Sequence, residues 1–337
     1  MKTIERVLVH RLGSIGDFVV ALPCIHLLRR NFPDAKIVLL TNDPVDGRAA
    51  PAMSVFGDTG LVNDYLGYPL QTRDLGQLRR LVAAVRAYGP DLLVYLVSRI
   101  DLPSVVRDKL FFHWVGVHRA VGFPLSRDLR DYRQVADGLW EQEGFRLARC
   151  LAPLGDASPE RPENWDLRLS AAECAEADRL LAGAPPALIG LSVGTKQAIK
   201  DWGDDNWRIV VEGLGRPDLG IVLVGSAEER ARSDSVVQNW PGPVYNCCGD
   251  ASPRVSATLL RRTRMLICHD SGPMHLAAVV GTRCVALFSR LGRPGEWFPF
   301  GDRHKIFYPP SPGDTIHSIA PREVLAAARA LLAEETI

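Results

Sequence analysis

The sequence lacks a dominant charge of either sign, because its 337 residues carry a net charge of only +1 with acids and bases well mixed. This balance argues against nucleic acid as the main partner. No apolar run approaches the length of a membrane span, and residues 1–9 enter a strand pattern without a secretion signal. We therefore expect a cytoplasmic protein. Peripheral contact with the cytoplasmic face of the inner membrane stays open, although no amphipathic basic helix stands out.

Cysteine is too irregularly spaced to indicate a metal site or a disulfide framework. The seven cysteines match neither zinc-ligand spacing nor C-x-x-C, which favours buried free thiols. The chain also lacks a Walker loop, a Ser-His-Asp arrangement and a metal-ligand cluster. Its first glycine motif is not the G-x-G-x-x-G of dinucleotide-binding folds, which argues against a nicotinamide oxidoreductase.

Apolar runs alternate with helical patterns along the whole chain, which is typical of parallel sheets covered by helices on both faces. Pro153–Trp165, with three prolines, is the best linker. The length suits two domains. We predict an α/β protein with domains at 1–155 and 166–318, followed by a closing segment at 319–337.

The stretch 265–278 reads as a buried strand, a tight turn and a helix start. Its notable residues are Asp270, Ser271, Gly272, Pro273 and His275. Asp270 or Ser271 can cap the helix, the proline suits its first turn, and the glycine allows a ligand to approach the backbone. Free N–H groups and the positive end of the helix dipole suit a phosphate. The alternative is an ordinary capped helix on which the histidine is merely packed.

A second motif, 11–17, also joins a strand to a helix through glycines. Asp17 falls at the helix start, where a carboxylate is electrostatically favoured. It is interpreted either as a helix-capping acid or as a functional base.

Loops at the carboxyl ends of parallel strands line the ligand crevice of such folds. In the second half these loops are 195–202, 225–229 and 270–275. They supply a helix N-terminus, the cations Lys196 and Lys200, and acids able to bind ribose hydroxyls. Together with Asp17 as a proton acceptor, these parts fit group transfer from a nucleotide diphosphate, whose leaving group gains charge.

Three segments resemble, in the right order, motifs of glycosyltransferase family 9, the lipopolysaccharide heptosyltransferases and their relatives. They are Arg11-Leu-Gly-Ser-Ile-Gly-Asp17, Lys200-Asp-Trp202 with Trp207, and Asp270-Ser-Gly-Pro-Met-His-Leu-Ala-Ala278. The resemblance implies a GT-B fold, with two Rossmann-like domains whose parallel sheets face each other across a cleft. It also implies an inverting transferase that needs no bound metal or cofactor, and a last helix, Pro321–Leu332, that packs back on the first domain.

The resemblance further implies residue roles. Asp17 is the general base, and Lys200 contacts the donor phosphates. The implied donor-binding residues are Gly16, Thr195, Lys196, Glu228, Glu229, Asp270, Ser271, Gly272, Pro273 and His275. Candidate acceptor contacts are Gly13, Ser14 and Arg48.

The implied donor is ADP-heptose, and the implied acceptor is a saccharide or glycolipid such as lipopolysaccharide core. Because a fold does not fix a function, two alternatives stay open on the same scaffold. One is a nucleotide-sugar 2-epimerase or hydrolase, and the other is a non-catalytic nucleotide-sugar-binding protein.

Overall fold

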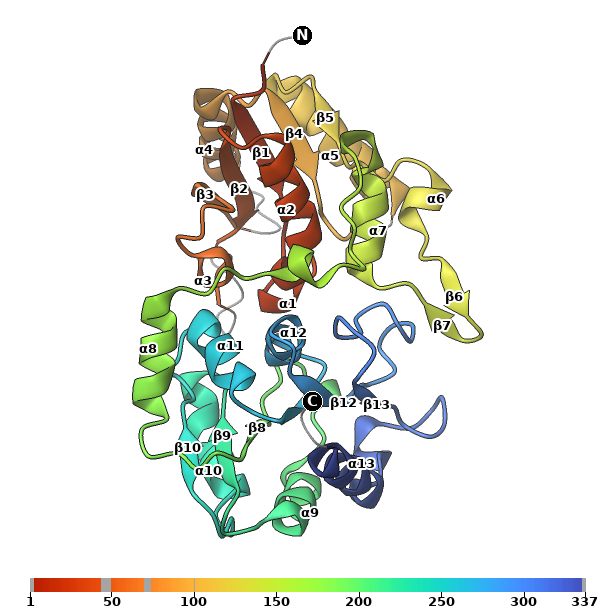
Figure 1. Ribbon diagram of the computed structural model, residues 1–337. Coiled ribbons are helices and arrows are strands. Elements are labelled where there is room, and N and C mark those ends of the chain that lie inside the picture. The colour runs from red at the N-terminus through yellow and green to blue at the C-terminus, as the bar shows by residue number, and fades with distance from the viewer. Residues whose placement is uncertain (1–2, 44–49, 70–73, 100, 335–337) are drawn as a thin grey trace. The chain divides into compact units, whose positions relative to one another are not determined.

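The computed structural model describes residues 3–43, 50–69, 74–99 and 101–334 (Figure 1). The chain divides into two units, Met1–Leu167 and Arg168–Ile337. Each unit contains a parallel sheet with helices on both faces, as the alternating pattern predicts. No helix within these described ranges is both long enough and apolar enough to cross a membrane.

The first unit is built on a five-stranded sheet of order β3-β2-β1-β4-β5. Its strands are β1 (Arg6–His10), β2 (Lys36–Asn42), β3 (Asp64–Tyr68), β4 (Leu92–Tyr95) and β5 (Ala120–Val121). All pairings are parallel, and β1 is buried from its second residue onward, as expected of a central strand covered on both faces. The strand order reverses direction between β1 and β4.

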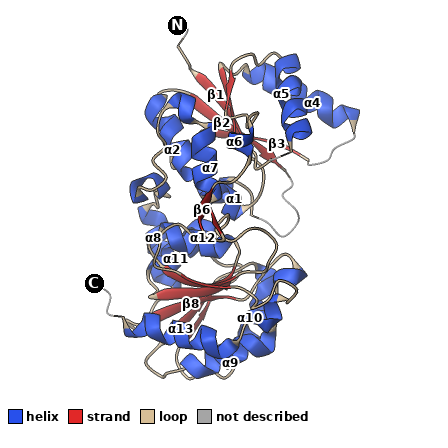
Figure 2. Ribbon diagram, turned by 90° about the vertical axis from the view of Figure 1, so that its right-hand side faces the viewer, coloured by secondary structure: helices blue, strands red, loops and turns tan. Residues whose placement is uncertain are grey.

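Helices cover both faces of this sheet (Figure 2). They are α1 (Ile15–Val19), α2 (Leu22–Asn31), α3 (Met53–Phe56), α4 (Leu75–Tyr88), α5 (Leu102–Val115), α6 (Arg127–Arg130) and α7 (Glu143–Cys150). One buried cluster joins Val82 and Val85 of α4 to Val105 and Phe112 of α5 over the central strand residue Leu8. Helices α4 and α5 therefore share one face of the sheet.

The sequence of residues 138–151 favours one continuous helix, but α7 begins only at Glu143. The preceding residues form a small antiparallel hairpin of β6 (Gln134–Ala136) and β7 (Leu139–Trp140). Its turn is Asp137-Gly138, and Gly138 adopts a positive φ of 67°, which is the conformation that two-residue hairpin turns require.

The segment 153–165, predicted as a linker, is an ordered part of the first unit. It contains the short 3-10 helices η1 (Ala152–Leu154) and η2 (Pro162–Trp165), both packed on α2. Trp165 is buried, and its indole N–H donates to the carbonyl of Pro159 at 2.7 Å. His26 on α2 forms a 2.8 Å hydrogen bond with the carbonyl of Asp166. The unit consequently ends after Leu167.

The second unit has a six-stranded sheet of order β10-β9-β8-β11-β12-β13, with parallel pairings throughout. Its strands are β8 (Leu188–Ser192), β9 (Gly220–Leu223), β10 (Val244–Asn246), β11 (Met265–His269), β12 (Arg283–Leu287) and β13 (Lys305–Phe307). The four central strands are buried along their full length. Here the strand order reverses between β8 and β11.

Six α-helices and three 3-10 segments complete the described part of the second unit. They are α8 (Ala171–Leu180), α9 (Asp204–Leu214), α10 (Arg230–Val236), α11 (Pro253–Arg261), α12 (Gly272–Val279), α13 (Pro321–Ala333), η3 (Ala198–Lys200), η4 (Ala227–Glu229) and η5 (Ile316–Ser318). Figure 2 shows α9, α10 and α13 on one side of the sheet and α8, α11 and α12 on the other. Helix α13 packs against α9, β11 and β12, with Val324, Ala328 and Leu331 in this unit's core. Its predicted packing on the first domain stays a prediction.

Candidate active site

The motifs singled out from the sequence directly follow the strands between which the strand order of each sheet reverses. The segment 11–17 follows β1, and the segments 195–200 and 270–275 follow β8 and β11. Ligands of open parallel sheets bind outside the carboxyl ends of the strands at such reversal points. Each unit therefore offers one candidate ligand-binding region.

Asp17 lies in the first turn of α1 and completes a capping box with Ser14. The backbone N–H of Ser14 donates to Asp17 Oδ2 at 2.9 Å. Gly13 has a φ of 129°, and a Cβ atom there would lie 2.1 Å from Asp17 Cγ, so only glycine fits. Asp17 therefore has a structural role, yet 26% of its side chain stays exposed.

Arg11 is fully buried directly beside Asp17. Its Nε donates to the backbone carbonyl of Asp17 at 2.9 Å, and its Nη2 lies 3.6 Å from Asp17 Oδ1. Its Nη1 donates at 2.6 Å to both the Leu96 carbonyl and Ser98 Oγ, just beyond β4. Among the described residues, Nη2 has no hydrogen-bond partner, so the ion pair with Asp17 is its main interaction. Arg11 thus fixes the Asp17 turn across the β1–β4 reversal point.

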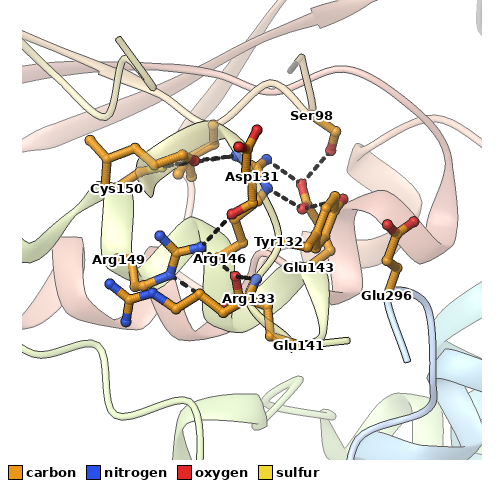
Figure 3. Close-up of polar contacts among 12 residues, drawn as sticks. Ser98, Asp131, Tyr132, Arg133, Glu141, Glu143, Arg146, Arg149, Cys150 and Glu296 are labelled. Carbon is orange, nitrogen blue, oxygen red and sulfur yellow. Dashed lines mark hydrogen bonds and ion pairs between the residues drawn. The ribbon is translucent and has the colours of Figure 1, made fainter. Parts of the chain in front are cut away.

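A buried ion pair between Glu143 and Arg146 on α7 extends this arrangement (Figure 3). The two side chains are fully buried and joined by hydrogen bonds of 2.7 and 2.8 Å. Ser98 and Tyr132 donate hydroxyl hydrogen bonds of 2.6 and 2.8 Å to the Glu143 carboxylate. Arg11 Nη1 lies 3.7 Å from Glu143 Oε1. A continuous set of charges therefore joins α7 to Asp17.

The pKa of Glu143 reflects this setting. Burial by itself would raise it, but the charge and hydrogen bonds of Arg146, with smaller contributions from Arg11 and Ser98, outweigh burial and bring the pKa below its ordinary value. Glu143 is therefore ionised near neutral pH.

Asn42, at the end of β2, holds the glycine turn from its other side. Its side chain accepts a hydrogen bond from Gly13 N at 2.8 Å and donates one to Gly13 O at 3.3 Å. The predicted donor contact Gly16 is buried within α1. The predicted acceptor contact Arg48 lies outside the described residues.

In the second unit the structure brings Lys200 and Asp270 together. Lys200 Nζ lies 2.6 Å from Asp270 Oδ2, which joins the segment following β8 to the residue just before α12. Both side chains are mostly buried. Lys196 is exposed and Thr195 is half-buried on the same segment. The predicted phosphate contacts therefore lie on neighbouring loops of this sheet.

His269, which the sequence did not indicate as a site residue, ties these loops together. Its buried ring accepts the Trp202 backbone N–H at Nε2 (3.0 Å) and donates from Nδ1 to the Gly194 carbonyl (3.3 Å). Burial lowers the pKa of His269 to about 4, so the ring is neutral. Trp202 is fully buried edge-on against Trp207, with ring centroids 5.0 Å apart. This anchor fixes the backbone two residues after Lys200.

Glu229 fills the space between the loops that follow β8 and β9. Its Oε2 accepts the Ser226 backbone N–H at 2.8 Å. A Cβ atom would lie 1.9 Å from Glu229 Oε1 if placed on Gly194, and 2.4 Å from Oε2 if placed on Gly225. The two glycines thus make room for this carboxylate, whereas the adjacent Glu228 is exposed.

The start of α12 differs in one respect from the prediction. Ser271 occupies the N-cap position, but its hydroxyl donates to the His269 carbonyl at 3.3 Å and does not cap the helix. Pro273 lies in the first turn as predicted. His275 is buried, with its ring edge-on to Trp297 at a centroid distance of 6.2 Å. Pro273 has no N–H, and the Met274 N–H donates to the Ser271 carbonyl at 3.1 Å. The Gly272 N–H is therefore the first-turn donor to which an anion can bind.

Within the described ranges, no group of three or more His, Cys, Asp or Glu side chains is arranged to hold a metal ion. The candidate site of the first unit offers a carboxylate paired with an arginine. The candidate site of the second unit offers a lysine beside a helix start.

Two Rossmann-like units with these loops are typical of the GT-B fold. The chain belongs to glycosyltransferase family 9 (heptosyltransferase), whose family model matches residues 140–314. Both predictions, the family indicated by the motifs and the GT-B fold, are thereby confirmed. The protein is a glycosyltransferase.

Individual relatives are distant in sequence. The chain is 24% identical over 296 residues to lipopolysaccharide heptosyltransferase 3 of Escherichia coli, covering 81% of this chain and 79% of that protein. A family 9 glycosyltransferase structure from Veillonella parvula matches with a TM-score of 0.76 at 18% identity, over 99% of both chains. The E. coli heptosyltransferase WaaC with ADP matches with a TM-score of 0.66 at 16% identity, over 97% of this chain and 99% of that chain.

Proposed function

We propose that this glycosyltransferase transfers heptose from ADP-heptose to a hydroxyl group of a saccharide acceptor in lipopolysaccharide core, in the cytoplasm. The observation that carries the proposal is the Lys200–Asp270 pair beside the start of α12. The relatives support the choice of substrates. One is named a lipopolysaccharide heptosyltransferase, and WaaC structures contain ADP or ADP-2-deoxy-2-fluoro heptose.

In this proposal the second unit binds the donor. The Gly272 N–H at the start of α12 and the Lys200 ammonium hold the diphosphate, and they stabilise the charge that it gains as the glycosidic bond breaks. Glu229 or Glu228 accepts hydrogen bonds from ribose hydroxyls. Asp270 positions the ammonium group through their 2.6 Å contact.

The first unit supplies the base. As the acceptor oxygen bonds to the anomeric carbon, its proton passes to the Asp17 carboxylate. The bond between that carbon and the phosphate oxygen breaks, and ADP leaves with the electron pair, so the anomeric configuration inverts. Arg11, paired with Asp17, keeps the carboxylate in place for this step.

The donor assignment is tested by thermal unfolding with ADP, UDP, GDP, CDP and NAD. A ligand that binds only the folded state stabilises by about 2.7 kcal/mol at a hundredfold excess over its dissociation constant. We expect a clear rise in melting temperature with ADP alone. A rise with UDP or GDP instead contradicts the donor but not the fold.

The base assignment is tested with Asp17→Asn, which can still accept the Ser14 N–H hydrogen bond. We expect turnover to fall about 10²- to 10⁴-fold, with the ADP-dependent thermal shift unchanged. Asp74→Asn is the matched control, because Asp74 is an exposed helix-capping carboxylate of the same unit. Normal turnover in Asp17→Asn refutes the base, and product formed from donor alone would favour a hydrolase or epimerase.

A further inference from the structure

Helix α5 has an apolar face on each side. Val105, Phe112 and Val115 on one side are buried in the first unit's core. The opposite side carries an exposed apolar stripe at every fourth residue: Leu102 (41% exposed), Val106 (38%), Leu110 (63%) and Trp114 (63%). Because both faces are apolar, the sequence shows no amphipathic pattern here.

Exposed basic side chains lie on the same two helices as this stripe and directly after them. Within 74–99 and 101–119, the exposed basic and histidine residues on and after α4 and α5 are Arg79, Arg80, Arg86, Arg107, Lys109, His113, His118 and Arg119. The exposed acids in these ranges are Asp74 and Asp101, which cap the starts of the two helices. Arg107 is paired with Asp108, whose Oδ1 lies 2.8 Å from Arg107 Nη2. We call the stripe and these basic residues the α4–α5 surface; even without Arg107, its exposed arginine and lysine side chains outnumber its two exposed acids.

The two helices form one continuous face. They lie side by side in Figure 2 and pack on the same side of the sheet. Arg86 of α4 places its guanidinium 5.4 Å from the Trp114 ring centroid, and its Nε donates to the Val115 carbonyl at 3.2 Å. The charges of α4 therefore border the apolar stripe of α5 directly.

We propose that the α4–α5 surface docks the protein peripherally on a membrane rich in anionic phospholipids. Leucine and tryptophan side chains flanked by arginine and lysine are the pattern of a helix lying in the membrane interface. The long basic side chains reach the head groups while the stripe enters the acyl boundary. A second copy of this chain is a less suitable partner for the α4–α5 surface. A symmetric dimer through this surface would place the basic residues of the two copies against each other.

This surface goes beyond the proposed reaction and does not depend on it. Helix α5 follows β4, so it begins at the carboxyl edge of the sheet that also carries the Asp17 turn. Docking through α5 would therefore suit an acceptor that is itself anchored in the membrane.

The test is sedimentation of the full chain with phosphatidylcholine vesicles made with or without phosphatidylglycerol. We expect binding only when phosphatidylglycerol is present, and weaker binding as salt rises. Leu110→Ser with Trp114→Ser should abolish binding. Arg79→Gln with Lys109→Gln should weaken partition roughly 30-fold, at about fivefold per charge removed.

Matched controls come from the second unit, where Ile209 is an exposed apolar residue on α9 and Arg179 an exposed basic residue on α8. Ile209→Ser and Arg179→Gln should sediment like the unaltered chain, as should Asp17→Asn, which separates docking from catalysis. Apart from Asp17, the altered side chains are exposed, so every variant except Asp17→Asn should keep the melting temperature of the parent. The proposal is overturned if the unaltered chain does not sediment with the vesicles, or if the control variants lose sedimentation equally. It is also overturned if the chain forms a dimer without lipid and the Leu110→Ser, Trp114→Ser variant does not.

Discussion

Replacing Glu143 by glutamine tests whether a buried charge network supports the Asp17 turn. The carboxylate is fully buried, bonded twice to Arg146 and 3.7 Å from Arg11 Nη1. The network has two cations, Arg11 and Arg146, and two anions, Glu143 and Asp17. Glutamine keeps the shape but removes one anion, which leaves one buried positive charge without compensation.

Removing one partner of a buried pair costs about 3–5 kcal/mol, because the other charge stays desolvated. That is a large share of the roughly 5–15 kcal/mol that stabilises a typical domain. We therefore expect a loss of about 3 kcal/mol or more in the free energy of unfolding. Glu176→Gln is the control: Glu176 pairs with Arg179 on the surface of α8, and its loss should leave stability unchanged.

The assay is urea unfolding followed by far-ultraviolet circular dichroism at several pH values. The pKa of Glu143 is lowered in the folded chain from its ordinary value of about 4.5. Its stabilising contribution is therefore complete above about pH 4.5 and declines as the pH falls through the folded pKa. The difference between the parent and Glu143→Gln should shrink below pH 4.5.

The same variant also tests a positioning role. Since Arg11 contacts both Glu143 and Asp17, we expect kcat to fall while the KM for donor stays unchanged. A loss of stability below about 1 kcal/mol at pH 7 refutes the argument from buried charge. An unchanged kcat in a destabilised variant refutes the positioning role alone.

Three further predictions concern single residues. Burial lowers the pKa of His10 to about 4, so between pH 7 and pH 5 the uptake of a proton by the unfolded His10 should by itself cost the folded chain about 2 kcal/mol. Urea unfolding should show a loss smaller by this amount in His10→Gln, while the similarly buried His269 makes its own contribution in both proteins. Lys200→Met should lower kcat/KM about 10²- to 10³-fold, since it removes a charge beside the diphosphate, whereas Lys36→Met should not. Gly194→Ala should displace the Glu229 carboxylate and abolish the ADP-dependent thermal shift, in contrast to the unhindered Gly313→Ala.

The central strands were predictable because full burial leaves long apolar runs in the sequence. The edge strands β3 and β13 were not, since Asp64–Tyr68 and Lys305–Phe307 are only partly buried and carry no comparable pattern. The hairpin around Asp137-Gly138 was missed although its turn is a strong local signal. The Asp-Gly turn alone was enough to predict the hairpin, but the residues around it were interpreted as a helix.

The candidate site shows the same division between local and distant causes. Asp17, Lys200 and Asp270 could be singled out because each lies in a short motif whose chemistry is readable by itself. Glu143 could not, because it lies 126 residues after Asp17 and its meaning depends on Arg11 being buried between them. Arg11 itself stands in the first motif, yet nothing local explains an arginine there. Its reason appears only when β1, β4 and α7 converge: a fully buried guanidinium requires carboxylates, and one of the two it contacts is the proposed base.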